Sequence, residues 1–121
     1  MAGDMGHVIA HEGRYQDFLI RRCTNFERVF LILGNNDYKG IAAPVDETIA
    51  MARSFDENPK IHGRLSILEK DGFDMYDGSA GRVSLLGCTL WSDVPEGAKE
   101  NVNAASNIRY HDSIYENSLK A

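Results

Sequence analysis

Hydrophobic positions along this chain change their spacing several times, and each spacing predicts a different element. Between Arg14 and Phe26, apolar side chains recur every three or four residues, which is typical of one helix face. The run from Val29 to Leu33 is apolar throughout and ends at Gly34, which indicates a strand buried on both faces. A helix followed directly by a buried strand is half of a βαβ unit. The predicted inner face of the helix consists of Tyr15, Phe18, Leu19, Cys23 and Phe26.

A second helix and three short strands are predicted farther along the chain. Pro44 is expected to open the helix, because proline is favoured at a first helical position, and Asn58-Pro59 to stop it. The predicted inner face of this helix is Val45, Ile49, Ala52 and Phe55. The predicted strands are Arg64–Glu69, Phe73–Tyr76 and Arg82–Trp91, separated by turns at Asp71-Gly72 and Asp77–Gly81. Tight turns between short strands favour antiparallel pairing, so the expected fold class is α/β with mixed parallel and antiparallel strands.

The two ends of the chain carry weaker signals. Ala2–Gly6 resembles the turn that follows a strand, so a strand is expected upstream of Gly3. From His7 to Gly13 the sequence has no clear period and is interpreted as a loop. Residues 96–121 are polar with scattered apolar positions, and we expect a weakly ordered tail there, with a short helix around Glu100–Ile108. The prediction is therefore one partial domain over residues 1–121.

Charge and cysteine content narrow the function classes. The chain has 13 basic and 18 acidic residues and a net charge of −5, which disfavours nucleic-acid binding. Its two cysteines, Cys23 and Cys88, lie on apolar stripes without zinc spacing, so we expect two buried free thiols. The first residues lack the features of a signal peptide, and no apolar run is long enough for a membrane span. A cytoplasmic location without membrane contact is the resulting expectation.

Polar side chains follow both predicted strand ends. Asp4 lies in the first turn, and Asn35, Asn36 and Asp37 follow the buried strand. If the two strands are parallel neighbours, both turns emerge at one sheet edge, where α/β proteins bind ligands. Asp4 and Asn35 could then approach a common metal ion, because carboxylate and amide oxygens both bind divalent cations. The alternative is that these residues only form turns through Asx hydrogen bonds.

Four segments, taken in order, resemble the calcineurin-like metallophosphoesterases, especially a small fungal and bacterial branch. They are Ala2–Gly6, Tyr15–Leu19, Val29–Tyr38 and Leu85–Ser92. The last segment contains the string Gly-Cys-Thr-Leu-Trp-Ser, which is fairly specific to that branch. The resemblance runs from about Ala2 to about Val94.

This resemblance implies an αββα sandwich of mixed sheets and hydrolysis of phosphomono- or phosphodiesters by two metal ions. It implies that Asp4 is the bridging aspartate, that Asn35 is a metal ligand and that Asp37 closes the third motif. Asn36 stands at the position of the family's catalytic histidine, and an amide cannot donate a proton as an imidazolium does. The expected cofactors are divalent ions of manganese, iron, zinc or magnesium, and the expected partner is a phosphoester substrate.

The family's Asp-x-His and Gly-His-x-His motifs are absent from this sequence, so the resemblance implies a domain truncated at both ends. His7 lies near Asp4 in sequence and is a candidate to line the site. His7 and His11 would share a helix face and could pair on a metal, although solvated loop histidines are the interpretation we favour. Two oxygen ligands cannot complete two coordination spheres, so tight binuclear metal binding by this chain is not expected.

Two functions follow from these patterns. The first is metal-dependent phosphoester hydrolysis, weak or absent because the catalytic set is incomplete. The alternative is a non-catalytic binding or assembly module that pairs, for example with a second copy, through exposed sheet edges. A third interpretation, a nucleotide loop at Gly3–Gly6, is poor because the segment matches neither GxGxxG nor the Walker pattern.

Overall fold

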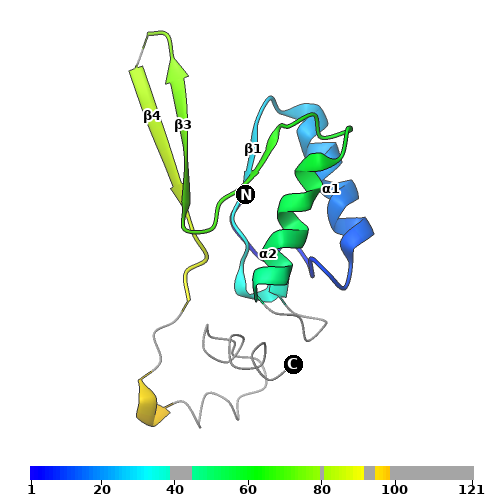
Figure 1. Cartoon of the computed structure of the whole chain (residues 1–121), viewed down its shortest axis with the longest axis vertical. Helices are drawn as coiled ribbons and strands as arrows, with labels where there is room; N and C mark the ends of the chain where they lie inside the picture. The colour runs from blue at the N-terminus through cyan, green and yellow to red at the C-terminus, as the bar shows by residue number, and fades with distance from the viewer. Residues whose placement is uncertain (39–44, 80, 92–94, 99–121) are drawn as a thin grey trace.

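The computed structural model describes residues 1–38, 45–79, 81–91 and 95–98 of the chain (Figure 1). The first half contains helix α1 (Glu12–Asn25), strand β1 (Val29–Leu31), 3₁₀ helix η1 (Asn35–Tyr38), helix α2 (Val45–Ser54) and 3₁₀ helix η2 (Phe55–Glu57). The second half contains strands β2 (Leu65–Ile67), β3 (Asp71–Asp77) and β4 (Gly81–Gly87) and 3₁₀ helix η3 (Glu96–Ala98). In this described part, no helix is both long and apolar enough to span a membrane.

Parallel and antiparallel pairs both occur, so the chain has the mixed α/β character that the pattern predicts. β1 pairs in parallel with β2, with Val29 opposite Leu65 and Leu31 opposite Ile67. On the other side of β1, Ala2 forms an isolated parallel bridge with Ile32. β3 and β4 form a separate antiparallel hairpin.

The main core lies between β1 and the helices. Because side chains alternate along a strand, Val29, Leu31 and Leu33 are buried whereas Phe30 and Ile32 are only half-buried. The prediction that this strand is buried on both faces is therefore wrong for one face. The core is completed from the helices and from the segments beside them by Val8, Tyr15, Leu19, Cys23, Tyr38, Val45, Ala52, Phe55, Ile61, Leu65 and Ile67.

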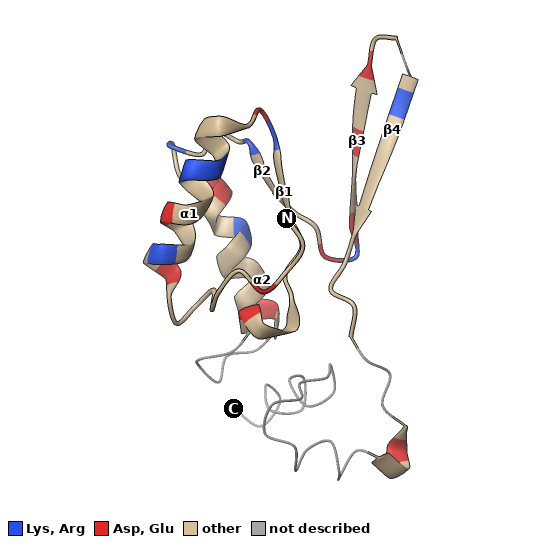
Figure 2. Cartoon of the chain, turned by 180° about the vertical axis from the view of Figure 1, so that it is seen from behind, with Lys and Arg blue, Asp and Glu red and all other residues tan. Residues whose placement is uncertain are grey.

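The hairpin lies on the opposite side of β1 and β2 from the two helices (Figures 1 and 2). Its contact with the rest of the chain lies near its base, where the Phe73 ring meets the Phe30 ring edge-on at 5.1 Å between centroids. Gly87, at the end of β4, packs so closely against Leu68 and Ile32 that an added Cβ would lie 2.6 Å from Leu68 Cβ. The far end of the hairpin projects away from the core (Figure 1).

Helix α1 differs from its prediction at both ends. It begins at Glu12 rather than Arg14, and the expected loop is shortened because His11 N–H already bonds to the His7 carbonyl in a helical turn. It ends at Asn25, where Phe26 adopts an extended conformation. Phe26 is 56% exposed, so its predicted place on the buried face is wrong. The helical period cannot be extrapolated past the residue at which the backbone leaves the helix.

Several strand and turn predictions also need correction. Asp71-Gly72 is not a turn but the start of β3, because the chain turns one residue earlier, at Lys70, which has a φ of 51°. β4 ends at Gly87 instead of continuing to Trp91. Cys23 is buried as expected, whereas Cys88 is only half-buried, and both thiols are free.

Some predictions lie outside the described residues. They are the helix-opening role of Pro44, the helix around Glu100–Ile108 and all of the predicted tail beyond Ala98. The predicted inner face of α2 is found in part, since Val45 and Ala52 are buried and Ile49 packs partly buried against the core. Phe55 is buried too, but it belongs to η2.

Candidate functional site

The turn after Ala2 and the turn after β1 lie next to each other. Ile32 N–H donates to the Met1 carbonyl at 3.0 Å, and Gly3 N–H donates to the Ile32 carbonyl at 2.8 Å. This short parallel pairing brings Asp4 beside the η1 residues at one sheet edge, as the sequence pattern predicts. Ligand sites of open α/β sheets form at such an edge.

The Asp37 carboxylate holds this edge together. Its Oδ2 accepts the backbone N–H of Asp4 at 2.8 Å and that of Gly34 at 2.6 Å. Its Oδ1 accepts the N–H of Met5 at 3.0 Å and that of Gly6 at 3.1 Å. Asp37 is fully buried, so these bonds replace water around its carboxylate. Asp37, which was predicted to line the site, therefore holds the backbone of the turn at residues 4–6 in place.

Tyr15 provides the fifth donor to the Asp37 carboxylate. Its hydroxyl reaches Oδ1 at 3.2 Å from helix α1, so the helix, the first turn and η1 meet at one acid. Burial, followed by the nearby Asp37 carboxylate, raises the pKa of the Tyr15 hydroxyl far above its ordinary value. Burial also raises the pKa of Asp37, while the hydrogen bonds from Gly34, Asp4 and Gly6 oppose that rise.

Two glycines allow the turns to approach this closely. Gly3 has a φ of +69°, and a Cβ on it would lie 2.8 Å from the Cα of Gly34. A Cβ on Gly34 would clash with the Asp4 carboxylate and lie 2.5 Å from the Asp4 backbone nitrogen. Asp4 itself has a φ of 53°, a region in which aspartate is better tolerated than most residues. The position of Asp4 thus depends on the absence of side chains at both glycines.

The Asp4 carboxylate is exposed and is bound by Asn36. Its Oδ1 accepts the Asn36 backbone N–H at 3.1 Å, and its Oδ2 accepts the Asn36 side-chain amide at 2.8 Å. The side chain at the family's histidine position therefore contacts the candidate bridging aspartate directly. As a neutral donor, this amide orients the carboxylate but has no proton to give to a leaving group.

The remaining predicted residues have different surroundings. Asn35 is half-buried at the start of η1, one residue before the amide that binds Asp4. His7 is half-buried, and its ring stacks on that of His11, with 5.1 Å between centroids and 12° between planes. The two histidines thus share a face, although no acid joins them to form a metal-binding group of three in the described part of the chain.

A two-metal centre needs more ligands than this edge offers. In the described residues, no group of three or more His, Cys, Asp or Glu side chains is close enough to hold a metal ion. Asp4 and Asn35 provide oxygen atoms, and the Asp37 oxygens are already occupied by the five donors described above. These residues alone therefore do not fit a complete binuclear site.

A second buried polar cluster ties the segment after β4 to the same sheet edge. Thr89 Oγ1 lies 2.7 Å from the Leu33 carbonyl oxygen and 2.7 Å from Glu69 Oε2. The Tyr38 hydroxyl lies 3.2 Å from the same Thr89 oxygen, and the Tyr38 and Trp91 rings are 5.3 Å apart. Trp91 is partly buried against the core.

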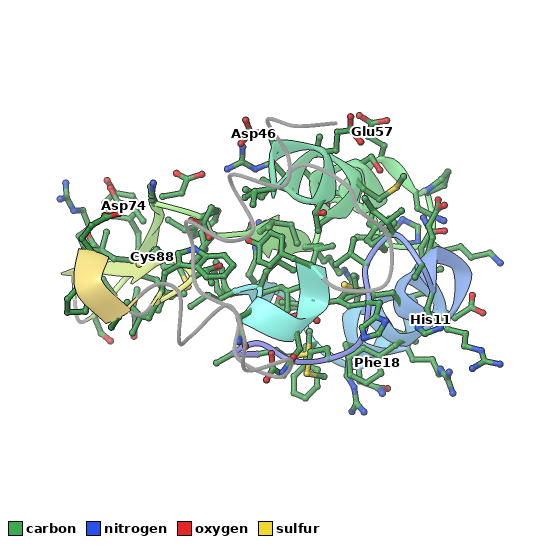
Figure 3. All side chains as sticks on the ribbon, turned by 90° about the horizontal axis from the view of Figure 1, so that it is seen from below. His11, Phe18, Asp46, Glu57, Asp74 and Cys88 are labelled. Carbon is green, nitrogen blue, oxygen red and sulfur yellow. The ribbon has the colours of Figure 1, made fainter. Side chains whose placement is uncertain are left out.

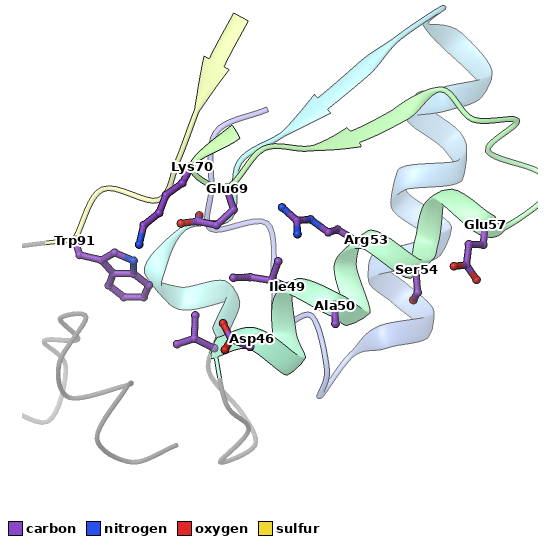
Figure 4. A pocket seen from close by; sticks show the side chains of 10 residues that line it. Asp46, Ile49, Ala50, Arg53, Ser54, Glu57, Glu69, Lys70 and Trp91 are labelled. Atoms are coloured by element: carbon purple, nitrogen blue, oxygen red, sulfur yellow. The ribbon is translucent and has the colours of Figure 1, made fainter. Parts of the chain in front are cut away.

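A groove of about 580 Å³ runs along α2 rather than over Asp4 (Figure 4). Acidic and basic side chains both line it, and Trp91 borders one end. The view from below shows Asp46 of α2 and Glu57 of η2 along the upper edge of the molecule, and Phe18 of α1 and His11, which precedes α1, below them (Figure 3). Because the groove charges are mixed and none of the predicted site residues line it, we do not assign the candidate chemistry to it.

Comparison with known proteins does not assign a family. No family model, no curated protein and no solved structure matches this chain.

Sequence reasoning missed the residues that hold the edge in place. Tyr15 was predicted only as part of an apolar face, although a buried tyrosine hydroxyl usually needs a hydrogen-bond partner. Glu69 gave no local signal, because its partner Thr89 is far away in the sequence. A polar residue inside an otherwise apolar pattern, such as Thr89 between Cys88 and Leu90, is the feature that could have indicated a buried polar cluster.

Proposed function

We propose that this chain is a member of the calcineurin-like metallophosphoesterases whose described residues provide only part of the catalytic set. Its function class is then metal-dependent hydrolysis of phosphomono- or phosphodiesters, with weak or absent turnover by this chain alone. The observation that carries the proposal is the juxtaposition of Asp4 and η1 at one sheet edge, with Asn36 bound to the Asp4 carboxylate. The motif residues named by the resemblance thus come from distant segments and meet at one place.

The roles proposed for individual residues differ in kind. Asp4 and Asn35 are the proposed metal ligands, because Asp4 is exposed and both carry oxygen atoms. Asp37 is a positioning residue, since its bonds to the backbone of Asp4 and Gly34 fix the two turns relative to each other. Asn36 occupies the acid–base position without acid–base capacity, a loss worth about 10²–10⁴-fold in rate. The proposed αββα sandwich rests on the family resemblance and on the mixed strand pairing.

Hydrolysis of a chromogenic phosphodiester in the presence of Mn²⁺ tests this proposal. Turnover by the wild-type protein is expected to lie barely above the rate with Mn²⁺ alone, and Asp4→Ala should remove that excess. Asp17→Ala is the matched control, because Asp17 is an exposed acid on α1 outside the candidate edge. Turnover that survives Asp4→Ala would refute the assignment of the site, and strong turnover that depends on Asp4 would refute the proposed weak activity.

The second candidate function is a non-catalytic binding or assembly module. The observation that favours it is the β3–β4 hairpin, which projects from the core and exposes large apolar side chains. Tyr76 is 77% exposed and Leu86 is 80% exposed. Exposed strand edges with apolar side chains are templates for pairing with another chain.

A further inference from the structure

The two faces of the β3–β4 hairpin differ in composition. The register places Phe73 opposite Leu85 and Met75 opposite Val83, so the two central pairs of one face are apolar, whereas the end pairs of that face are Asp71–Gly87 and Asp77–Gly81. The other face is mixed, with Asp74 opposite Ser84 and Tyr76 opposite Arg82. Val83 is nevertheless 48% exposed, and Phe73 contacts the half-buried ring of Phe30 on β1.

The two edges of the hairpin differ in charge. β3 carries Asp71, Asp74 and Asp77, whereas the four residues from Val83 to Leu86 on β4 carry no charge. Figure 2 shows the acids along β3, which is the strand nearer the core, and shows β4 as the outer strand. Charged side chains deter edge-to-edge pairing, so the outer edge formed by β4 is the less protected edge.

An isolated pair of strands is a marginal structure in water. Hairpins generally need a third strand or a packed face for independent stability. In the part of the chain that the structure describes, β3 and β4 pair only with each other. A further strand on the outer edge would bond to the β4 backbone groups that point away from β3 and would place its side chains beside those of β4.

We propose that β4 of a second copy of this chain pairs antiparallel with β4 about a two-fold axis at Ser84, which gives a four-stranded sheet. This inference rests on the second candidate function, the assembly module, and specifies its partner and its contact surface. A two-fold interface brings the same surface of both copies together, so the edge must be complementary to itself.

The sequence of β4 satisfies that requirement best in this register. Val83 of one copy lies opposite Leu85 of the second copy, and the two residues have the same parity and therefore project from the same face. The side chains that line up across the four strands are then Phe73 and Leu85 of one copy, followed by Val83 and Met75 of the other copy. None of these four residues is polar. A two-fold axis at Val83 would instead place Gly81 opposite Leu85, and an axis at Leu85 would place Gly87 opposite Val83. Either shift replaces an apolar contact between the copies by a glycine. Shifting the axis to Arg82 places two arginines opposite each other, which is unfavourable.

Pairing through β3 is disfavoured by the same argument. A two-fold axis at Asp74 places two aspartates opposite each other, and Asp71 then faces Asp77 of the second copy. Three pairs of like charges would thus meet along one short edge. The occupant of the free edge is therefore another β4 strand rather than another β3 strand.

Light scattering after size-exclusion chromatography gives the first test. The wild-type protein is expected to be a dimer at high micromolar concentration. Ser84→Lys places two lysines opposite each other across the axis, while each lysine faces Asp74 of its own hairpin, so the hairpin itself is not weakened. We expect it to raise the dimer dissociation constant about tenfold or more. Ser79→Lys, in the loop beyond the end of β3, is the matched control and should leave the dimer unchanged.

Disulfide trapping tests the register directly. In a Cys88→Ser background, Ser84→Cys puts two thiols on the axis, and facing residues in antiparallel strands have the Cα spacing that a disulfide requires. Rapid oxidation is expected to give a covalent dimer, whereas Ser79→Cys should not, because the two loops lie at opposite ends of the four-stranded sheet. A wild-type monomer would refute both self-assembly and this edge. A dimer in which Ser84→Cys and Ser79→Cys cross-link equally would refute this edge while leaving the assembly module intact.

Discussion

The Oδ2 atom of Asp37 accepts a hydrogen bond from the backbone N–H of Asp4 at 2.8 Å, across 33 positions of sequence. Through this bond, Asp37 fixes the backbone of Asp4, and the exposed carboxylate of Asp4 is the candidate metal ligand. The same Asp37 carboxylate also bonds to the N–H groups of Met5, Gly6 and Gly34. The two turns therefore form one unit, in which Asp37 holds the backbone and Asp4 presents its side chain.

Asp37→Asn should destabilise the protein strongly. An amide replaces one carboxylate oxygen by an NH₂ group, which would face backbone N–H donors or the Tyr15 hydroxyl instead of accepting from them. Leaving buried donors of this kind unsatisfied is expected to lower the free energy of unfolding by about 2–4 kcal/mol. Urea unfolding followed by circular dichroism measures the change.

Asp17→Asn is the control for that substitution, because Asp17 is exposed and its expected effect is within about 0.5 kcal/mol. Amide hydrogen exchange adds a local measurement, in which Asp37→Asn should accelerate exchange at Asp4, Met5 and Gly6. Equal unfolding free energies for the two variants would contradict the anchoring role of Asp37.

Gly34→Ala should displace Asp4. The added Cβ would clash with the Asp4 side chain and backbone, so the first turn must move or the sheet edge must open. Overpacking of this kind typically costs about 1–3 kcal/mol. Gly13→Ala is the matched control, since a methyl group added to Gly13 in α1 would meet nothing within 4 Å, and helical alanine is favoured over glycine by up to about 1 kcal/mol. Thermal unfolding of both variants should show opposite shifts, and a harmless Gly34→Ala would contradict the described contact.

Stability should fall at alkaline pH because of the buried tyrosines. Burial raises the pKa of Tyr38 from 10.0 to about 12, and the Tyr15 pKa is raised as well. Between these values the unfolded chain has released the phenolic proton and the folded chain still holds it, so rising pH favours unfolding. Each such tyrosine contributes a slope of up to about −1.4 kcal/mol per pH unit. Below pH 10 this contribution to stability is fully present.

Urea unfolding at a series of alkaline pH values measures that slope. Tyr38→Phe should reduce it by about one tyrosine's share, although it also removes the contact with Thr89 and so lowers stability at every pH. Tyr76→Phe is the matched control, because Tyr76 is 77% exposed on the hairpin and should leave the slope unchanged. The same slope in both variants would show that Tyr38 does not retain its proton in the folded protein.

Elements with a clear apolar period could be predicted from the sequence. The spacing of Tyr15, Leu19 and Cys23 reflects contact with one core and survives in α1. The apolar run that ends at Gly34 likewise predicted the position of β1 and of the polar residues that follow it, because its side chains contact the same core. The Asp71-Gly72 prediction failed because turn propensity is local, and Lys70 had already reversed the chain. The prediction that Phe26 lies on the buried helix face failed because α1 ends one residue before it.

The roles within the candidate edge were harder to predict. An acid after a strand has the same local sequence whether it binds a metal or holds a backbone. Asp37 takes the second role because its donors come from residues 4 to 6 and from Tyr15, which are far from it in sequence. The exposure of the hairpin could not be predicted either. An apolar residue such as Leu86 is expected to be buried, and the sequence does not show whether another part of the structure covers it.

We propose that the edge beside η1 is a partial metal-binding edge that depends on Asp4. Mn²⁺ titration followed by electron paramagnetic resonance tests it most directly, with wild-type protein, Asp4→Asn and the control Asp17→Asn. We predict weak binding by the wild-type protein and by the control, and at least about tenfold weaker binding by Asp4→Asn, a difference of about 1.4 kcal/mol. Equal Mn²⁺ affinity in wild type and Asp4→Asn would contradict metal binding by Asp4.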